Sequence, residues 1–248
     1  MQSTAGTPWS FVLQAGKRLR YVVDRLVARW SLVPTDPILD PALFAWTNAM
    51  RDQWQMIRDE AFAIMRAPGG VPTLAEVSPD HGRIALGGWR SFFLRAYDYP
   101  VPANMQRCPG TSAALSRIPT LNSAFFSILA PGASIPEHRG PTKGIITCHL
   151  TLQTPSFDDC RLRIDGREVG WTEGEFLILD DSYRHWVSND GDVTKVVLLI
   201  QVRRPSRWPG RMLIAMFLWG IRRSRFVQEA RRNLASWDDA YDQVEAAA

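Results

Sequence analysis

Between Pro136 and Val202 the sequence is divided into short strand-like segments that are separated by turn signals. Asp165-Gly166 predicts a tight hairpin turn between two of them. Short strands at a spacing of about 8–12 residues are typical of a sandwich or jelly roll. The predicted strands are Ile145–Gln153, Arg161–Ile164, Glu168–Trp171, Glu175–Leu179, His185–Ser188 and Lys195–Val202.

The segments on either side of this region have helical periodicity. Apolar and basic residues alternate at helical spacing through residues 1–33, and three prolines in Pro34–Pro41 predict a linker. A second helix is expected over Ala42–Met65, a short one over Leu115–Leu121 that ends before Pro119, and helical structure over Trp208–Asp242. The expected organisation is therefore an N-terminal helical segment (residues 1–88), a β-domain (89–205) and a basic, amphipathic helical segment (206–248). The predicted fold class is mainly β with flanking helices.

Composition excludes several classes of protein. The 248 residues are 46% hydrophobic with a net charge of +4, which suits one sizeable core and makes no general case for nucleic acid. Three cysteines favour a reducing compartment over a disulfide framework. The longest apolar run, Met212–Ile221, is about half of the roughly 20 residues that span a bilayer. We expect a cytoplasmic protein, with a peripheral contact on the inner face of the membrane as an open alternative.

Three histidines stand at positions that suit a shared site. His138 lies in a turn rich in Gly and Pro, His149 in the following strand, and His185 at the start of a later strand. One histidine in a β-core is more often structural than a ligand, but strand starts that are distant in sequence meet at one mouth of a jelly roll. Two imidazoles with open coordination positions suit a ferrous ion. Gly140 stands where the two-histidine, one-carboxylate pattern has an acid, so the residues alone leave both interpretations open.

A resemblance adds to this. The stretches Ser127–Gln153 and Trp171–Pro205 resemble the aspartyl/asparaginyl β-hydroxylase family. This implies an Fe(II)- and 2-oxoglutarate-dependent dioxygenase with a double-stranded β-helix, the jelly-roll or cupin-like fold. Several members of the family have glycine in place of the acid, as Gly140 does here. The flanks Leu43–Ala61, Trp89–Pro119 and Arg203–Trp219 are similar to the bacterial membrane-associated branch, which includes lipid A and ornithine-lipid acyl hydroxylases.

The resemblance implies a role for five residues. His138 and His185 would be the catalytic iron ligands, with O₂ and 2-oxoglutarate completing the centre. Ser127, His149 and Lys195 would contact 2-oxoglutarate, although the family has arginine where this chain has Lys195, and a lysine lacks the bidentate fork. For Asp180 and Asp181 we favour a turn cap that orients the loop before His185 over a replacement for the missing carboxylate ligand.

The substrate is less constrained. Ile145 and Thr147 stand where aspartyl-hydroxylating members carry arginines, which favours a lipid acyl chain slightly over an Asp or Asn side chain, free or in a peptide. We expect the strand faces to exclude water from the site through Ile145, Leu150, Leu152, Phe176 and Ile178. The alternative from another class is a non-catalytic β-helix binding module that has lost its metal.

The basic C-terminal segment leaves two interpretations open. From Arg203 to Arg232 there are nine arginines and one acid, Glu229, with tryptophans and methionines among them. This composition is typical of an interfacial helix on anionic lipid. It equally suits an amphipathic helix that packs on the barrel with its arginines in solvent.

Overall fold

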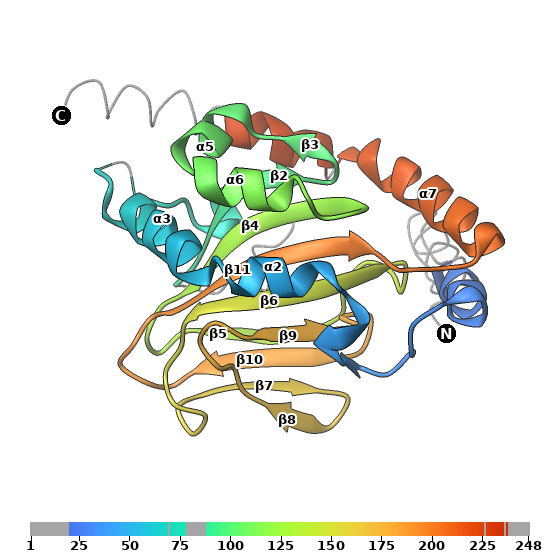
Figure 1. The fold of residues 1–248 in the computed structure, drawn as a ribbon, viewed down its shortest axis with the longest axis horizontal. Coiled ribbons are helices and arrows are strands. Elements are labelled where there is room, and N and C mark those ends of the chain that lie inside the picture. Colours follow the sequence, from blue (N-terminus) through green and yellow to red (C-terminus); the bar gives the residue numbers. More distant parts are fainter. Residues whose placement is uncertain (1–19, 69, 78–87, 226, 236, 238–248) are drawn as a thin grey trace, which may run out of the picture.

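Two antiparallel sheets face each other at the centre of the molecule (Figure 1). The computed structural model describes residues 20–68, 70–77, 88–225, 227–235 and 237. The larger sheet has seven strands in the order β1-β9-β6-β11-β4-β2-β3, and the smaller has four in the order β5-β10-β7-β8. From β4 onward the chain passes repeatedly between the sheets, which is the jelly-roll pattern, so the predicted fold class is confirmed.

The strands of the larger sheet are β1 (Ile38–Leu39), β2 (Trp89–Ala96), β3 (Tyr99–Pro100), β4 (Leu121–Leu129), β6 (Ile145–Gln153), β9 (Phe176–Leu179) and β11 (Lys195–Arg203). Those of the smaller sheet are β5 (Ser134–His138), β7 (Cys160–Ile164), β8 (Arg167–Val169) and β10 (His185–Asn189). The six strands predicted after Pro136 are therefore all present, and β8 is shorter and begins one residue earlier than expected. β1 comes from the segment predicted as an N-terminal linker and pairs with β9 at one edge of the sheet.

Helices cover the outer face of the larger sheet (Figure 1). Those on this face include α2 (Trp46–Arg51), α3 (Trp54–Arg66), α5 (Pro102–Arg107) and α6 (Pro109–Leu115). The other named helices are η1 (Pro41–Leu43), α4 (Leu74–Val77) and α7 (Trp208–Arg222). Leu74 of α4 lines the space between the sheets, and α7 packs against the helix of residues 20–30. Residues 20–30 and 227–235 are also helical, and the part of the predicted N-terminal helix at 1–19 lies outside the described residues.

Two helix predictions need correction. The single helix expected over Ala42–Met65 is divided into η1, α2 and α3, and Gln53, just before α3, has a non-helical backbone. The short helix expected over Leu115–Leu121 is wrong, because the helices α5 and α6 lie before it and each begins with a proline. Proline is favoured in the first turn, where its missing N–H has no intrahelical acceptor to lose.

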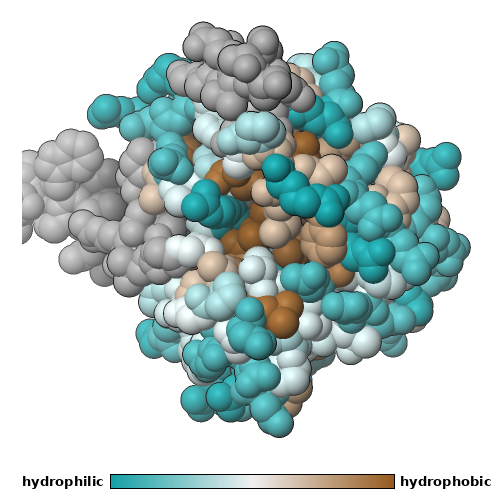
Figure 2. Space-filling view, turned by 90° about the vertical axis from the view of Figure 1, so that its left-hand side faces the viewer, coloured by the Kyte–Doolittle hydropathy of each residue, from teal (hydrophilic) through white to brown (hydrophobic). Residues whose placement is uncertain are grey.

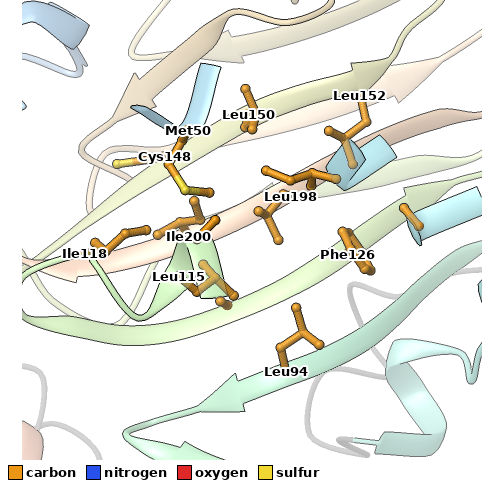
Figure 3. Packing of buried hydrophobic residues seen from close by; sticks show 14 of the residues in the cluster. Met50, Leu94, Leu115, Ile118, Phe126, Cys148, Leu150, Leu152, Leu198 and Ile200 are labelled. Carbon is orange, nitrogen blue, oxygen red and sulfur yellow. The ribbon is translucent and has the colours of Figure 1, made fainter. Parts of the chain in front are cut away.

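Alternation along the strands separates the molecule into two layers of side chains. In β6, Cys148, Leu150 and Leu152 point toward the helices, where they pack with Leu198 and Ile200 of β11 (Figure 3). Successive strand residues point to opposite faces, so Thr147 and His149 point toward the smaller sheet. The space between the sheets is therefore lined by the strand residues that alternate with those of the main core.

The Asp165-Gly166 hairpin is confirmed between β7 and β8. Asp165 and Gly166 have φ values of 48° and 81°. Two consecutive positive φ values are the geometry of a type I′ turn, whose twist matches that of the flanking strands.

Two opposite sides of the molecule differ in their surface features. Figure 2 shows the side that lies at the left of Figure 1, where hydrophobic side chains gather in a central hollow that is rimmed by hydrophilic ones. α7 and the helix of residues 20–30 lie toward the opposite side (Figure 1).

Candidate active site between the sheets

A cavity of about 340 Å³ lies between the two sheets. It is lined by all five of the residues that the resemblance assigns to a site: Ser127, His138, His149, His185 and Lys195. His138 and His185 come from the smaller sheet, and the other three come from the larger one. The structure thus brings both predicted groups into one space.

His138 and His185 are directly opposite each other in the pairing of β5 with β10. Their ring centroids are 4.2 Å apart and the ring planes are inclined by 55°. A register irregularity follows His185 in β10. Bulges of this kind re-aim side chains next to active sites.

Hydrogen bonds define the free nitrogen of each ring. Nδ1 of His138 lies 2.9 Å from the carbonyl oxygen of Pro136, and Nδ1 of His185 lies 3.0 Å from that of Tyr183. A carbonyl oxygen only accepts, so each Nδ1 carries the proton and donates it. Each Nε2 therefore keeps a lone pair for a metal ion, which is the arrangement that orients histidine ligands in metalloproteins.

The two imidazoles are held neutral. Burial, and secondarily the neighbouring His185, lowers the pKa of His138 to about 4, against a smaller raising effect of the Pro136 hydrogen bond. Burial likewise lowers the pKa of His185. Neutral imidazole is the form that binds a metal ion, so both rings are ready to do so at physiological pH.

Ser127 and His149 present hydrogen-bond donors to the same cavity. Trp89 Nε1 donates to Ser127 Oγ at 2.9 Å, and Trp171 Nε1 donates to His149 Nδ1 at 3.2 Å. Because His149 Nδ1 accepts, the proton of its neutral ring is on Nε2. The serine hydroxyl and this Nε2–H can therefore donate to an anionic ligand.

Lys195 adds a buried cation. It is 5% exposed, and its Nζ lies 3.4 Å from the centroid of the Trp171 ring, a cation–π contact. Burial lowers the pKa of Lys195 to about 7. Burial, followed by Lys195 and His185, lowers the pKa of His149 well below its ordinary value. A carboxylate at this end of the cavity would favour the charged form of the lysine.

Asp180 behaves as predicted, as a turn cap. Its Oδ1 accepts hydrogen bonds from the backbone N–H of Ser182 at 3.2 Å and from the Ser182 hydroxyl at 2.5 Å. Its Oδ2 pairs with Arg204 and, at 2.6 Å, with Lys143. These contacts hold the loop between β9 and β10, which leads into His185.

Asp181 departs from the turn-cap prediction, because its side chain lines the cavity. Thr147 Oγ1 donates to its Oδ2 at 2.7 Å, while its buried Oδ1 has no hydrogen-bond partner among the described residues. Burial raises the pKa of this carboxyl to about 7. An unpartnered buried carboxylate oxygen in a cavity is a feature that calls for a ligand, ion or water.

Gly140 makes room for this carboxylate. A Cβ at position 140 would lie 2.1 Å from Asp181 Oδ1, and the backbone N–H of Gly140 donates to the Asp181 carbonyl at 2.7 Å. The space next to His138 that an acid at position 140 would need is thus filled by an acid from another loop. The sequence signal was present, as a glycine at 140 together with an acid four residues before His185.

The prediction of which residues exclude water from the site is wrong. Leu150, Leu152, Phe176 and Ile178 pack under the helices, and Ile145 packs against α7 and the helix of residues 20–30. Since His149 points into the cavity, its neighbours in β6 must point away from it. The apolar lining instead includes Phe93, Phe125, Ile135, Leu162, Val187 and Leu199.

Within the described residues, no group of three or more His, Cys, Asp and Glu side chains is arranged to hold a metal ion. A metal ion in this cavity would therefore have the two imidazoles as its ligands from the described part of the chain.

The fold and the site together define a cupin-like double-stranded β-helix with three histidines, a serine and a buried lysine in one cavity. Comparison with protein families gives the assignment. Residues 51–205 match the family described as Aspartyl/Asparaginyl beta-hydroxylase, and the chain belongs to this family of hydroxylases.

The relatives divide into bacterial and animal proteins. An ornithine lipid ester-linked acyl 2-hydroxylase from Rhizobium tropici is 32% identical over 226 residues, which is 88% of this chain and 78% of that protein. Human aspartate beta-hydroxylase domain-containing protein 2 is 36% identical over 129 residues. This match covers 48% of the chain and 34% of the human protein, so the chain spans about a third of that relative.

Among solved structures, the cupin domain of a transcriptional regulator from Enterobacter cloacae is similar, with 17% identity and a TM-score of 0.32. The match covers 48% of this chain and 99% of that domain. The fold assignment rests on the sheet topology and does not need this likeness.

None of the helices in the described part of the chain combines the length and apolarity that crossing a bilayer requires.

Proposed function

We propose that the protein is an Fe(II)- and 2-oxoglutarate-dependent dioxygenase that hydroxylates an unactivated carbon, and that its substrate is the acyl chain of a membrane lipid. The observation that carries the proposal is the pair of adjacent imidazoles, each with Nδ1–H bonded to a carbonyl and Nε2 free. A cation, a hydroxyl and an imidazole N–H lie in the same cavity and suit a dicarboxylate.

The residues present fit the implied groups. His138 and His185 would hold the metal ion, and Lys195, Ser127 and His149 would bind the distant carboxylate of 2-oxoglutarate. When bound, the metal ion with O₂ and 2-oxoglutarate supplies the oxidising power: R–H, O₂ and 2-oxoglutarate become R–OH, succinate and CO₂. The unpartnered oxygen of Asp181 would orient a water next to the imidazoles, and the apolar lining would exclude bulk water.

The acyl-chain substrate is supported by two observations. The walls of the cavity are largely apolar, with Phe93, Phe125 and Leu199 from the larger sheet. The relative from Rhizobium tropici is named for its action on a lipid acyl chain.

An Asp or Asn side chain is the second candidate, and Arg139 is the observation that favours it. Arg139 lines the cavity while its Nη1 donates to the Ser182 carbonyl at 3.0 Å, so a cation stands beside the site. Comparison of lipids and peptides from cells with and without the gene separates the substrates. A gain of one oxygen confined to an Asp-containing peptide would replace the lipid proposal.

The test of the chemistry separates metal from co-substrate. We expect anaerobically prepared wild-type protein to bind one equivalent of Fe(II), to bind 2-oxoglutarate, and to release succinate when O₂ and substrate are admitted. The double variant His138→Ala/His185→Ala should lose the metal ion. His149→Ala is the matched control, because it should keep the metal ion and bind 2-oxoglutarate more weakly.

Equal metal binding by wild type and the double variant would overturn the proposal. So would a wild-type protein that takes up neither metal ion nor 2-oxoglutarate, and the chain would then be a binding module that has lost its metal.

A further inference from the structure

One face of α7 carries large apolar side chains that are exposed. Trp208, Met212, Met216 and Trp219 are 68%, 49%, 67% and 57% exposed. Their spacing of four, four and three residues places them in one stripe along the helix. α7 therefore does not have the apolar-in, polar-out pattern of an ordinary packed helix.

The opposite stripe of α7 is already used for packing. Ile214 and Leu218 are buried against Val23 and Val27 of the helix formed by residues 20–30. Gly210 lets this helix approach, since a Cβ there would lie 2.9 Å from that of Trp30. One stripe of α7 therefore packs on its neighbour while the other is exposed, so packing accounts for only one side of this helix.

The neighbouring helix extends the exposed apolar surface. Tyr21, Val22 and Leu26 are exposed on it, and Leu32 just after it. Of the eleven large hydrophobic side chains that are exposed among the described residues, eight belong to these two segments. We call residues 20–32 and 207–225 together the two-helix surface. Concentrated exposure of this kind marks an interaction site.

The charge of the two-helix surface has one sign. Its exposed charged residues are Arg25, Arg29, Arg207, Arg211, Arg223 and Arg225. Arg223 lies over the Trp219 ring at 3.8 Å. Residues 207–225 contain no acid, and the one acid in residues 20–32, Asp24, is turned inward to Thr142 and the backbone of Lys143. The partner must therefore be anionic and apolar.

These inward contacts join the surface to the cavity. Asp24 Oδ1 accepts from Thr142 Oγ1 at 3.0 Å and from the Lys143 backbone N–H at 2.7 Å. The same loop supplies Arg139, Gly140 and Pro141 to the cavity lining. The two-helix surface thus lies directly beside the loop that follows His138.

We propose that the two-helix surface docks on an anionic lipid bilayer, with Trp208 and Trp219 at the headgroup level and the arginines on lipid phosphates. Tryptophan rings prefer that level, and each arginine near an anionic surface adds to the attraction. Docking would place the loop at residues 139–143 next to the membrane, where a lipid acyl chain is available. The docking itself does not depend on the proposed chemistry, although it supplies the proposed substrate.

The test is sedimentation of the full-length protein with phosphatidylcholine vesicles prepared with and without phosphatidylglycerol. We expect binding to the anionic vesicles and at least tenfold weaker binding to the zwitterionic ones. Trp208→Ser/Trp219→Ser and Arg25→Glu/Arg211→Glu should each weaken binding to anionic vesicles by tenfold or more.

The matched controls are Phe157→Ser/Val193→Ser and Arg66→Glu/Arg117→Glu, which alter exposed residues outside the surface by the same chemistry and charge. Equal losses in controls and test variants would overturn the proposal, as would a wild-type protein that binds neither vesicle. Concentration-dependent dimerisation that only the tryptophan variant abolishes would assign the surface to a second copy instead.

Binding of Fe(II) and 2-oxoglutarate by the docking variants keeps the two proposals separate. If docking fails and ligand binding is intact, only the docking is wrong. If the wild type docks but binds no metal ion, only the proposed function is wrong.

Discussion

At the scale of single residues, the site depends on which atoms are already hydrogen-bonded. Two carbonyl oxygens accept hydrogen bonds from the Nδ1–H groups of His138 and His185, which leaves the lone pair of each Nε2 free. Two tryptophan N–H groups donate hydrogen bonds to Ser127 Oγ and His149 Nδ1. The hydroxyl hydrogen of Ser127 and the Nε2–H of His149 therefore remain available to the cavity. The indole groups therefore decide which hydrogen-bonding atoms of Ser127 and His149 remain free at this end of the cavity.

The lysine at this end predicts a pH dependence. Burial lowers the pKa of Lys195 to about 7, and a dicarboxylate needs the charged form of the lysine. Above pH 7 binding must add a proton, so the dissociation constant of 2-oxoglutarate should rise about tenfold per pH unit until the pKa of the complex is reached. The nearby His149 has a lowered pKa and stays neutral in this range, and Cys160 raises the pKa of the lysine slightly.

Calorimetric titration of Mn(II)-loaded protein between pH 7 and 9 measures this slope. Lys195→Arg is the control, because guanidinium stays charged and should give a flat profile. An equally steep profile in that variant would show that another group titrates.

The raised pKa of Asp181 predicts a stability effect. Burial raises the pKa of the Asp181 carboxyl to about 7 in the folded protein, whereas the unfolded chain releases this proton near the ordinary pKa of 3.8. The folded state therefore binds more protons between these values, and its stability falls as pH rises through them. Asp181→Asn removes this loss, so we expect the variant to be more stable than wild type at pH 8, by on the order of 1–4 kcal/mol, and nearly equal at pH 4.

Urea unfolding at both pH values tests it, with the exposed Asp36→Asn as the control. A difference that does not change with pH would mean that packing, not ionisation, causes the effect.

At the scale of elements, the loop between β9 and β10 is the part that must be held. Asp180 at its start is fully buried and pairs with Arg204, which follows β11, and with Lys143, which precedes β6. One carboxylate thus ties together three chain segments beside the cavity. Asp181 and His185 follow within five residues, so their placement depends on this ion pair.

Removing this carboxylate should be costly. Asp180→Ala leaves the Arg204 guanidinium buried without its partner, and we expect a loss of roughly 3–5 kcal/mol in the free energy of unfolding. Glu137→Ala breaks the exposed pair between Glu137 and Arg184, next to His138, and should cost about 1 kcal/mol or less. Urea unfolding of both variants measures the contrast, and equal costs would refute the role given to the buried pair.

At the scale of the whole molecule, the proposed ligands join the two sheets. The imidazoles proposed to hold the metal ion belong to the smaller sheet, and the residues proposed to bind 2-oxoglutarate belong to the larger one. A metal ion that carries 2-oxoglutarate would connect the two layers. Binding to the folded state alone should therefore stabilise the entire domain.

Mn(II) with 2-oxoglutarate, each at about a hundred times its dissociation constant, should add about 2.7 kcal/mol per site. For a chain of this size, the contribution of one site corresponds to a rise in Tm of roughly 5–10 °C, which scanning calorimetry detects. The variant His138→Ala/His185→Ala should show no rise on addition of Mn(II). A rise of the same size in that variant would locate the binding elsewhere.

Much of the fold was predictable because it follows from local chemistry. Alternating apolar residues and turn signals located the six strands after Pro136, and the Asp165-Gly166 pair located its hairpin. Proline positions were harder to interpret, since the helix that begins at Pro109 ends at Leu115, where the predicted helix starts. The family resemblance is confirmed, and the five site residues lie in one cavity.

By itself, the sequence determined the six strands after Pro136 and the Asp165-Gly166 hairpin, and it predicted that His138 and His185 are suited to a shared centre. Only the tertiary structure decided which face of β6 meets the cavity, and that Asp181 fills the space that Gly140 leaves. The physical reason is distance along the chain. Strand periodicity is a local property with a period of two residues, whereas the facing of two sheets and the meeting of positions 140 and 181 depend on long-range pairing.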